Sequence, residues 1–173
     1  MITKIKKNVW QLVQRLFGSH VYLIKLKDKN ILIDTDSPAN RIELKEKLQK
    51  LDLKPEDIDI VILTHNHFDH TGNINLFKNA KIYGRKNEFK AKKIIDIDKL
   101  DIKELRVIKT PGHTGGSICI FYDDVLFSGD TLFHRGTFGR TDLPGSSPEH
   151  IKHSLEKLKK LNFKILCPGH GRE

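Results

Sequence analysis

The chain has 173 residues, of which 31 are basic and 22 acidic, so its formal net charge is +9. This length suits one domain with a sizeable core, and an apolar share of 38% excludes a disordered chain. No apolar run approaches the roughly 20 residues of a membrane span, and the chain's 2 cysteines cannot form a disulfide framework. We therefore expect a cytoplasmic protein that does not enter a membrane.

The first predicted elements are a hairpin and a helix. Residues 21–26 and 30–33 are apolar runs separated by a polar turn, which predicts a β-hairpin. Ser37 and Pro38 then supply an N-cap and a first-turn proline. The apolar residues that follow at approximately helical spacing are Ile42, Leu44, Leu48 and Leu51.

The rest of the chain alternates short apolar runs with glycine-rich loops. Further strands are expected at residues 58–64, 81–83, 105–109, 118–122, 125–127 and 164–167. A polar stretch containing Lys86, Lys90, Lys92 and Lys93 suits a short, solvated helix. Ser147 and Pro148 begin a last helix, whose apolar stripe is Ile151, Leu155, Leu158 and Leu161. Strands outnumber helices, so we predict a mixed α/β domain.

Three histidines and an aspartate lie together directly after the buried strand at residues 58–64. They form the pattern His65-x-His67-x-Asp69-His70. Residues two apart at a strand end point the same way, so His65 and His67 can hold one cation while Asp69 and His70 face a second. Imidazole and carboxylate ligands suit zinc, iron or manganese, whereas calcium requires oxygen ligands alone.

Further ligands follow three other strands. Each stands after a glycine or a proline-glycine turn: His113 after residues 105–109, Asp130 after residues 125–127, and His170 after residues 164–167. Ligands that converge from several strand ends are how a sheet scaffold builds a metal site. The spacing therefore predicts a metal centre with ligands from four segments.

These motifs resemble the metallo-β-lactamase superfamily, from Ile31-Leu32-Ile33-Asp34 to Gly169-His170-Gly171. The resemblance implies a four-layer αββα sandwich of two mixed β-sheets, with residues 1–173 as a single catalytic domain. By the same resemblance, the first metal ion is held by His65, His67 and His113, and the second by Asp69, His70 and His170. Asp130 bridges the two ions, and Asp34 orients a ligand histidine.

Several positions separate the subfamilies. His67 stands where the di-iron flavoproteins have glutamate, and His70 and Asp130 differ from the arginine and cysteine of one class of zinc β-lactamases. Residues 128–133 and 139–145 are similar to glyoxalase II and to the related persulfide dioxygenases. Glyoxalase II continues into a C-terminal helical domain that binds glutathione, and no such domain is expected within these residues.

The resemblance therefore implies a metal-dependent hydrolase that cleaves a small, anionic thioester or ester. Two divalent ions, zinc in the first place and iron or manganese as alternatives, share a bridging water that attacks the carbonyl while Asp69 accepts its proton. The alternative is a mononuclear iron persulfide dioxygenase that uses His65, His113 and Asp130. A nuclease or nucleic-acid-binding protein is a third hypothesis, which the basic segments at residues 1–30 and 78–109 raise.

Other polar residues receive less specific interpretations. His134 and Arg140 are candidates for substrate contact, although an ion pair between Arg140 and Asp142 is favoured. The residues expected at the surface are His20, His134, His150 and His153, and those expected as buried apolar filler are Cys119 and Cys167. We expect a small-molecule substrate rather than a nucleic acid or a membrane, and a monomer or homodimer.

Overall fold

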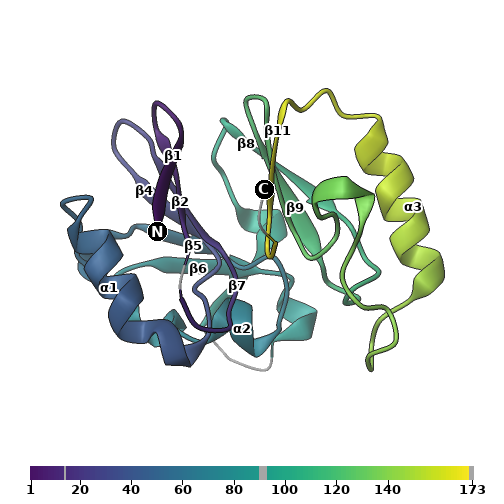
Figure 1. The fold of residues 1–173 in the computed structure, drawn as a ribbon, viewed down its shortest axis with the longest axis horizontal. Coiled ribbons are helices and arrows are strands. Elements are labelled where there is room, and N and C mark those ends of the chain that lie inside the picture. The colour runs from purple at the N-terminus through teal and green to yellow at the C-terminus, as the bar shows by residue number, and fades with distance from the viewer. Residues whose placement is uncertain (14, 90–92, 172–173) are drawn as a thin grey trace. The chain divides into compact units, whose positions relative to one another are not determined.

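The computed structural model describes residues 1–13, 15–89 and 93–171. The chain divides into two compact units. The first comprises Met1–Leu63, His67–Gly84 and Ala91–Ile95, and the second comprises Thr64–Asn66, Arg85–Lys90 and Asp96–Glu173. Each unit has its own β-sheet, shown as a ribbon in Figure 1. Whether they act as one catalytic domain stays a prediction.

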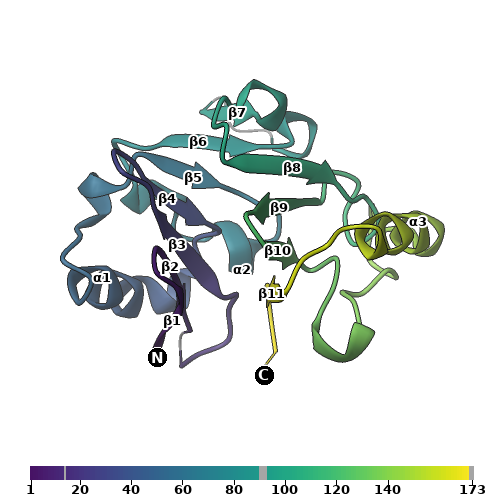
Figure 2. The same ribbon diagram turned by 90° about the horizontal axis from the view of Figure 1, so that it is seen from above.

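Among the described residues, the sheet of the first unit has seven strands in chain order (Figure 2). They are β1 (Ile2–Lys6), β2 (Val9–Leu12), β3 (Val21–Lys25), β4 (Asn30–Ile33), β5 (Ile60–Ile62), β6 (Lys81–Gly84) and β7 (Ile94–Asp96). Strands β1 to β4 pair antiparallel, and β4, β5 and β6 pair parallel, so the sheet is mixed. The predicted hairpin is confirmed as β3 and β4, with Leu23 opposite Leu32. Strand β5 is buried on both faces, as its unbroken apolar run predicts.

Strands β1 and β2, which pair with each other ahead of the predicted hairpin, were not predicted from the sequence. Strand β1 is only half-buried, and its lysines interrupt the apolar alternation that identifies a strand. The ammonium groups of Lys4 and Lys25 lie 5.7 and 5.5 Å from the centroid of the Trp10 ring. Cation–π contacts of this kind let a lysine-rich edge strand cover an aromatic side chain. The basic residues of this segment are therefore part of the sheet surface.

The first predicted helix begins later than the sequence indicates. A 3₁₀ turn, η1 (Pro38–Asn40), precedes α1 (Arg41–Gln49). Ser37 and Pro38 are the N-cap and the first-turn proline of η1, but the side chain of Ser37 makes no capping hydrogen bond, and its Oγ donates instead to the carbonyl of Phe17 at 2.8 Å. Ile42 was expected on the apolar stripe, but it is 73% exposed, because residues two apart in an α-helix lie on nearly opposite faces and Leu44 faces the core. Leu44 and Leu48 are buried as predicted.

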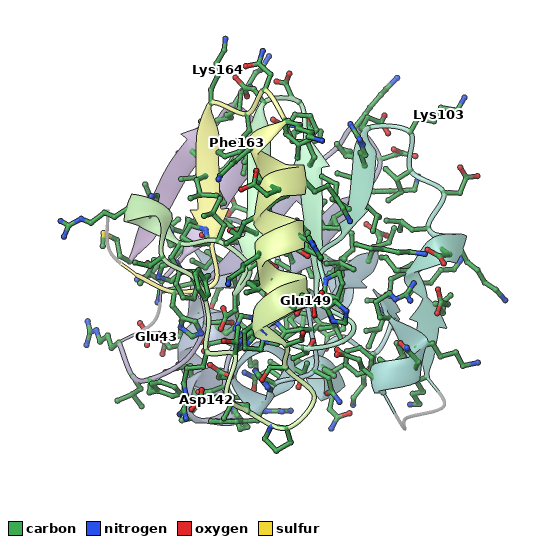
Figure 3. The ribbon with its side chains drawn as sticks, turned by 90° about the vertical axis from the view of Figure 1, so that its right-hand side faces the viewer. Glu43, Lys103, Asp142, Glu149, Phe163 and Lys164 are labelled. Atoms are coloured by element: carbon green, nitrogen blue, oxygen red, sulfur yellow. The ribbon has the colours of Figure 1, made fainter. Side chains whose placement is uncertain are left out.

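The part of the second unit that the structure describes contains a four-stranded mixed sheet in the order β11-β10-β9-β8. Its strands are β8 (Leu105–Lys109), β9 (Ile118–Tyr122), β10 (Val125–Gly129) and β11 (Ile165–Pro168). Strands β10 and β11 are parallel, and the other pairs are antiparallel. The last helix, α3 (Pro148–Lys159), lies against this sheet, between the labelled Glu149 and Phe163 in Figure 3. Its Leu158 packs into a core cluster with Ile108, Cys119 and Leu126.

The predicted start of α3 is confirmed. The side chain of Ser147 accepts a hydrogen bond from the backbone N–H of His150 at 3.2 Å, which satisfies one of the free amides of the first turn.

Within the lysine-rich stretch, η4 (Lys86–Glu88) is a 3₁₀ turn, whereas Lys90 and Lys92 lie outside the described residues. Among the residues that the structure describes, none of the helices has the length and apolar content that crossing a membrane requires.

Glycine at position 112 lets α3 approach the loop after β8. Gly112 has φ +149°, and a Cβ there would lie 2.5 Å from the backbone of Ile151. Gly112→Ala is therefore expected to lower the free energy of unfolding by about 2–3 kcal/mol, through overpacking and backbone strain. Denaturant unfolding measures the change. Gly136→Ala is the matched control, because Gly136 also has positive φ but nothing lies within 4 Å of its Cβ position. Equal losses in both variants would contradict the packing argument.

Candidate metal centre

The second unit brings together four of the predicted ligands. His113 follows β8, Asp130 follows β10 and His170 follows β11, so three strand ends of one sheet supply them. His65 belongs to the short segment Thr64–Asn66 of the same unit. His65, His113 and Asp130 are buried, and His170 is partly exposed.

The spacing of these side chains is typical of metal ligands. The Nε2 atoms of His113 and His170 lie 3.4 and 3.6 Å from the same oxygen, Oδ2 of Asp130. A hydrogen bond would be about 2.7–3.2 Å. Two ligand atoms each bound at about 2.1 Å to a tetrahedral zinc ion are about 3.4 Å apart. The rings of His65 and His113 meet edge to face, with centroids 4.8 Å apart. This donor set of imidazoles and a carboxylate fits a divalent cation.

The Nδ1 atoms of His113 and His65 lie within hydrogen-bond distance of neighbouring oxygen atoms, which orients the two rings. The Nδ1 atom of His113 donates to the backbone carbonyl of Arg140 at 2.8 Å, which fixes the tautomer with a lone pair on Nε2. The Nδ1 atom of His65 lies 3.0 Å from Oγ1 of Thr64. The role of the Arg140 carbonyl was not predicted, because a backbone acceptor has no signature in the sequence.

The side chain of Arg140 makes the ion pair that the sequence favours. Its guanidinium donates from Nε and Nη2 to the two carboxylate oxygens of Asp142 at 2.9 and 2.7 Å. Both side chains are exposed, so the pair contributes little stability. His134 lies in η6 (His134–Gly136) and is partly exposed. Substrate contact by His134 or Arg140 stays a prediction.

The first unit holds the other three predicted ligands around a four-residue helix, α2 (Phe68–Thr71). His67 precedes the helix, and Asp69 and His70 lie within it, both buried. The Nδ1 atom of His70 donates to Oδ2 of Asp34 at 2.7 Å. Asp34 follows β4 in a left-handed conformation with φ 61°. This contact is the one that the predicted orienting role of Asp34 requires.

A second buried carboxylate, Asp36, lies two residues after Asp34 and is part of a polar network. Its Oδ1 accepts hydrogen bonds from the Ser37 N–H at 2.6 Å and from Nδ2 of Asn40 at 3.0 Å. Among the described residues, no group donates to Oδ2. Burial raises the pKa of Asp36 to about 6, and the hydrogen bonds from Asn40 and Ser37 lower it less. The folded protein therefore binds the proton of this carboxyl more tightly than the unfolded chain does.

Asp36→Asn is expected to stabilise the fold at alkaline pH. Because the pKa is raised from 3.8 to about 6, the native state binds more protons than the unfolded state between these values, and stability falls as pH rises through this window. Asparagine keeps the Oδ1 acceptor without the charge, so we expect a gain of about 1–3 kcal/mol at pH 8 and little change at pH 4. Denaturant unfolding at both pH values tests this, and a less stable variant at pH 8 would contradict it.

The remaining histidines and cysteines follow the sequence interpretation with one exception. His150 and His153 are exposed on α3 as predicted. The expectation that His20 lies at the surface was wrong: it is 9% exposed, and its Nδ1 accepts a hydrogen bond from Nε2 of Gln11 at 3.0 Å. Its position directly before β3 places it against the neighbouring strand β2. Cys119 and Cys167 are buried as expected, and burial raises the pKa of the Cys119 thiol to about 11, which argues against a thiolate nucleophile.

The fold and this ligand pattern match a known family. The family model described as the metallo-β-lactamase superfamily matches residues 15–87 and 93–170. The chain belongs to the metallo-β-lactamase superfamily, and the predicted α/β class with this fold is confirmed.

Individual relatives show how far the similarity extends. The chain is 34% identical to a "Probable metallo-hydrolase" of Methanocaldococcus jannaschii, over 90% of this chain and 88% of that protein. It is 38% identical to a hydroxyacylglutathione hydrolase of Prochlorococcus marinus, over 62% of this chain and 49% of that protein. The solved structure of TTHA1623 in a di-iron-bound form is similar with a TM-score of 0.72 and 25% identity, covering 89% of this chain and 88% of that one.

Proposed function

We propose that this protein is a metal-dependent hydrolase that cleaves a small, anionic thioester or ester. The observation that carries the proposal is the placement of two imidazole Nε2 atoms at 3.4 and 3.6 Å from one oxygen of Asp130. That arrangement suits a divalent cation better than a hydrogen-bond network. Membership of the superfamily and the similarity to a metallo-hydrolase and to a hydroxyacylglutathione hydrolase support hydrolase activity.

The proposed centre binds two divalent ions. His65, His67 and His113 would hold the first, Asp69, His70 and His170 would hold the second, and Asp130 would be a ligand of both. Zinc is the first choice, and the di-iron form of TTHA1623 supports iron as an alternative. When bound, such ions lower the pKa of a coordinated water and polarise a carbonyl group.

The chain's own residues orient the ligands and move the proton. Asp34 and the carbonyl of Arg140 accept the Nδ1–H bonds of His70 and His113, so the Nε2 atom of each ring would be the one to bind a metal ion. Asp69, which is buried, would orient the attacking water and accept its proton. No side-chain nucleophile is required, which agrees with the raised pKa of Cys119.

A panel of thioesters tests the proposal. Protein purified under argon and reconstituted with zinc is mixed with anionic acyl thioesters and with matched oxygen esters, and the released thiol or acid is quantified. We expect oxygen-independent turnover that a chelator removes and added zinc restores. Absence of turnover across the panel in the metal-loaded protein would contradict the proposal.

One observation favours a second candidate, an iron-dependent persulfide dioxygenase. His65, His113 and Asp130 lie in the same unit. The ring centroids of the two histidines are 4.8 Å apart, and Nε2 of His113 lies 3.4 Å from Oδ2 of Asp130. Two histidines and a carboxylate are the ligand set of non-haem iron oxygenases. One iron per chain and oxygen uptake with a persulfide substrate would favour this candidate over hydrolysis.

A further inference from the structure

A glutamate outside the predicted ligand set joins two ligand-bearing loops of the second unit. The Oε2 atom of Glu88 accepts a hydrogen bond from the backbone N–H of Asn66 at 3.2 Å. Its Oε1 atom accepts one from the backbone N–H of Gly116 at 2.6 Å. The side chain of Asn66 in turn donates from Nδ2 to the carbonyl of Glu88 at 2.8 Å. One carboxylate therefore binds two separate backbone segments.

Both of these segments carry metal-ligand candidates. Asn66 stands directly after His65, and Gly116 stands three residues after His113. The same segments are joined once more, because the N–H of Ile118 donates to the carbonyl of Thr64 at 2.9 Å. The residues on both sides of His65 are therefore linked by hydrogen bonds to the segment that follows His113. This double attachment fixes the edge-to-face approach of the two rings.

The close approach depends on glycine at position 116. A Cβ on Gly116 would lie 2.5 Å from both Cγ and Cδ of Glu88, so a larger residue would displace the carboxylate. Hydrogen bonds from backbone amides to a carboxylate are charge-assisted and stronger than those between neutral groups. The surroundings of Glu88 are therefore built for a carboxylate that holds two amides.

We propose that Glu88 is a positioning residue that sets the geometry of His65 and His113 in the metal centre. The inference rests on the proposed function, because it assigns these two imidazoles to a metal ion. Glu88 acts through the backbone of Asn66 and Gly116 and does not contact the ion. Its loss lets the two rings move apart, which weakens metal binding and lowers kcat while KM stays near the wild-type value.

Cobalt binding provides a test that does not require hydrolysis. Metal-free wild type, Glu88→Ala, Glu88→Gln and the control Glu104→Ala, at an exposed glutamate of the same unit, are titrated with Co²⁺ against a chelator. We expect about 10–100-fold weaker binding and altered visible absorption bands for Glu88→Ala. Glu88→Gln keeps one acceptor oxygen and is expected to be intermediate, and Glu104→Ala is expected to lie within twofold of wild type. Wild-type affinity and bands in folded Glu88→Ala would overturn the inference.

A second variant covers the case in which Glu88→Ala does not fold. Gly116→Ala displaces the same carboxylate and keeps its charge, so it is expected to weaken Co²⁺ binding to a similar extent. Unchanged Co²⁺ affinity in this variant would also overturn the inference. The proposed hydrolysis can fail separately: a wild type that binds Co²⁺ but cleaves no thioester would contradict the reaction and leave the role of Glu88 testable.

Discussion

Replacing Asp130 with alanine is expected to abolish hydrolysis, with kcat/KM lowered more than about 1,000-fold. Its Oδ2 atom is the oxygen that the Nε2 atoms of both His113 and His170 approach, at 3.4 and 3.6 Å. In the proposed centre Asp130 contacts both ions, so its loss weakens each of them. Elemental analysis of the purified variant is expected to show less bound metal than wild type, in parallel with the loss of turnover.

The fold is expected to survive the Asp130 substitution. The side chain lies at the end of β10, outside the apolar core cluster around Leu126, so the variant is expected to unfold cooperatively like wild type. Asp101→Ala, at an exposed position of the same unit, is the matched control and is expected to keep full activity. Turnover of Asp130→Ala within tenfold of wild type would contradict the assignment of this residue to the metal centre.

Asp34→Ala is expected to weaken both metal binding and the fold. The Nδ1–H of His70 would lose its acceptor in a fully buried place, at a cost of about 1–3 kcal/mol. Alanine at φ 61° adds about 1 kcal/mol of backbone strain. Metal affinity is expected to fall about 10–100-fold, because the imidazole is no longer oriented. Chelator competition and denaturant unfolding measure the two effects.

Asp34→Asn separates these contributions. Asparagine tolerates the left-handed backbone conformation, and its amide oxygen can still accept the His70 hydrogen bond. We therefore expect a loss of stability below about 1 kcal/mol and a smaller loss of metal affinity than in Asp34→Ala. If both substitutions had the same effect, the hydrogen bond to His70 would not be what Asp34 contributes.

The strands that the sequence predicts well are those whose apolar character is uninterrupted. Residues 30–33 and 60–62 are buried between neighbouring strands, so nearly every side chain there is apolar. Strand β1 escaped prediction because it lies at the edge of its sheet, where Lys4 covers Trp10 and polar residues suffice. Edge strands carry less of the pattern from which a strand is recognised.

The start of α1 shows how tertiary contacts override a local signal. Ser37 before Pro38 is a typical N-cap pair, yet the hydroxyl of Ser37 is engaged by the carbonyl of Phe17, a residue 20 positions earlier. The turn that Ser37 begins is the 3₁₀ turn η1, and α1 begins after it at Arg41. A contact between residues this far apart leaves no trace in local spacing.

The candidate site divides in the same way. Its side-chain ligands could be predicted, because the His-x-His-x-Asp-His pattern and the glycine turns before His113 and His170 are visible in the sequence. The groups that orient the ligands could not be predicted from the sequence. The carbonyl of Arg140 and the amides bound by Glu88 belong to the backbone, and every residue type has them.

The ratio of metal to protein tests the central claim most directly. Wild-type protein, purified under argon and dialysed against trace zinc, is analysed by elemental mass spectrometry alongside Asp130→Ala. The proposed centre predicts close to two divalent ions per chain for wild type and a clear decrease for the variant. A wild-type protein that retains no zinc, iron or manganese after this treatment would contradict the metal centre and the hydrolytic function built on it.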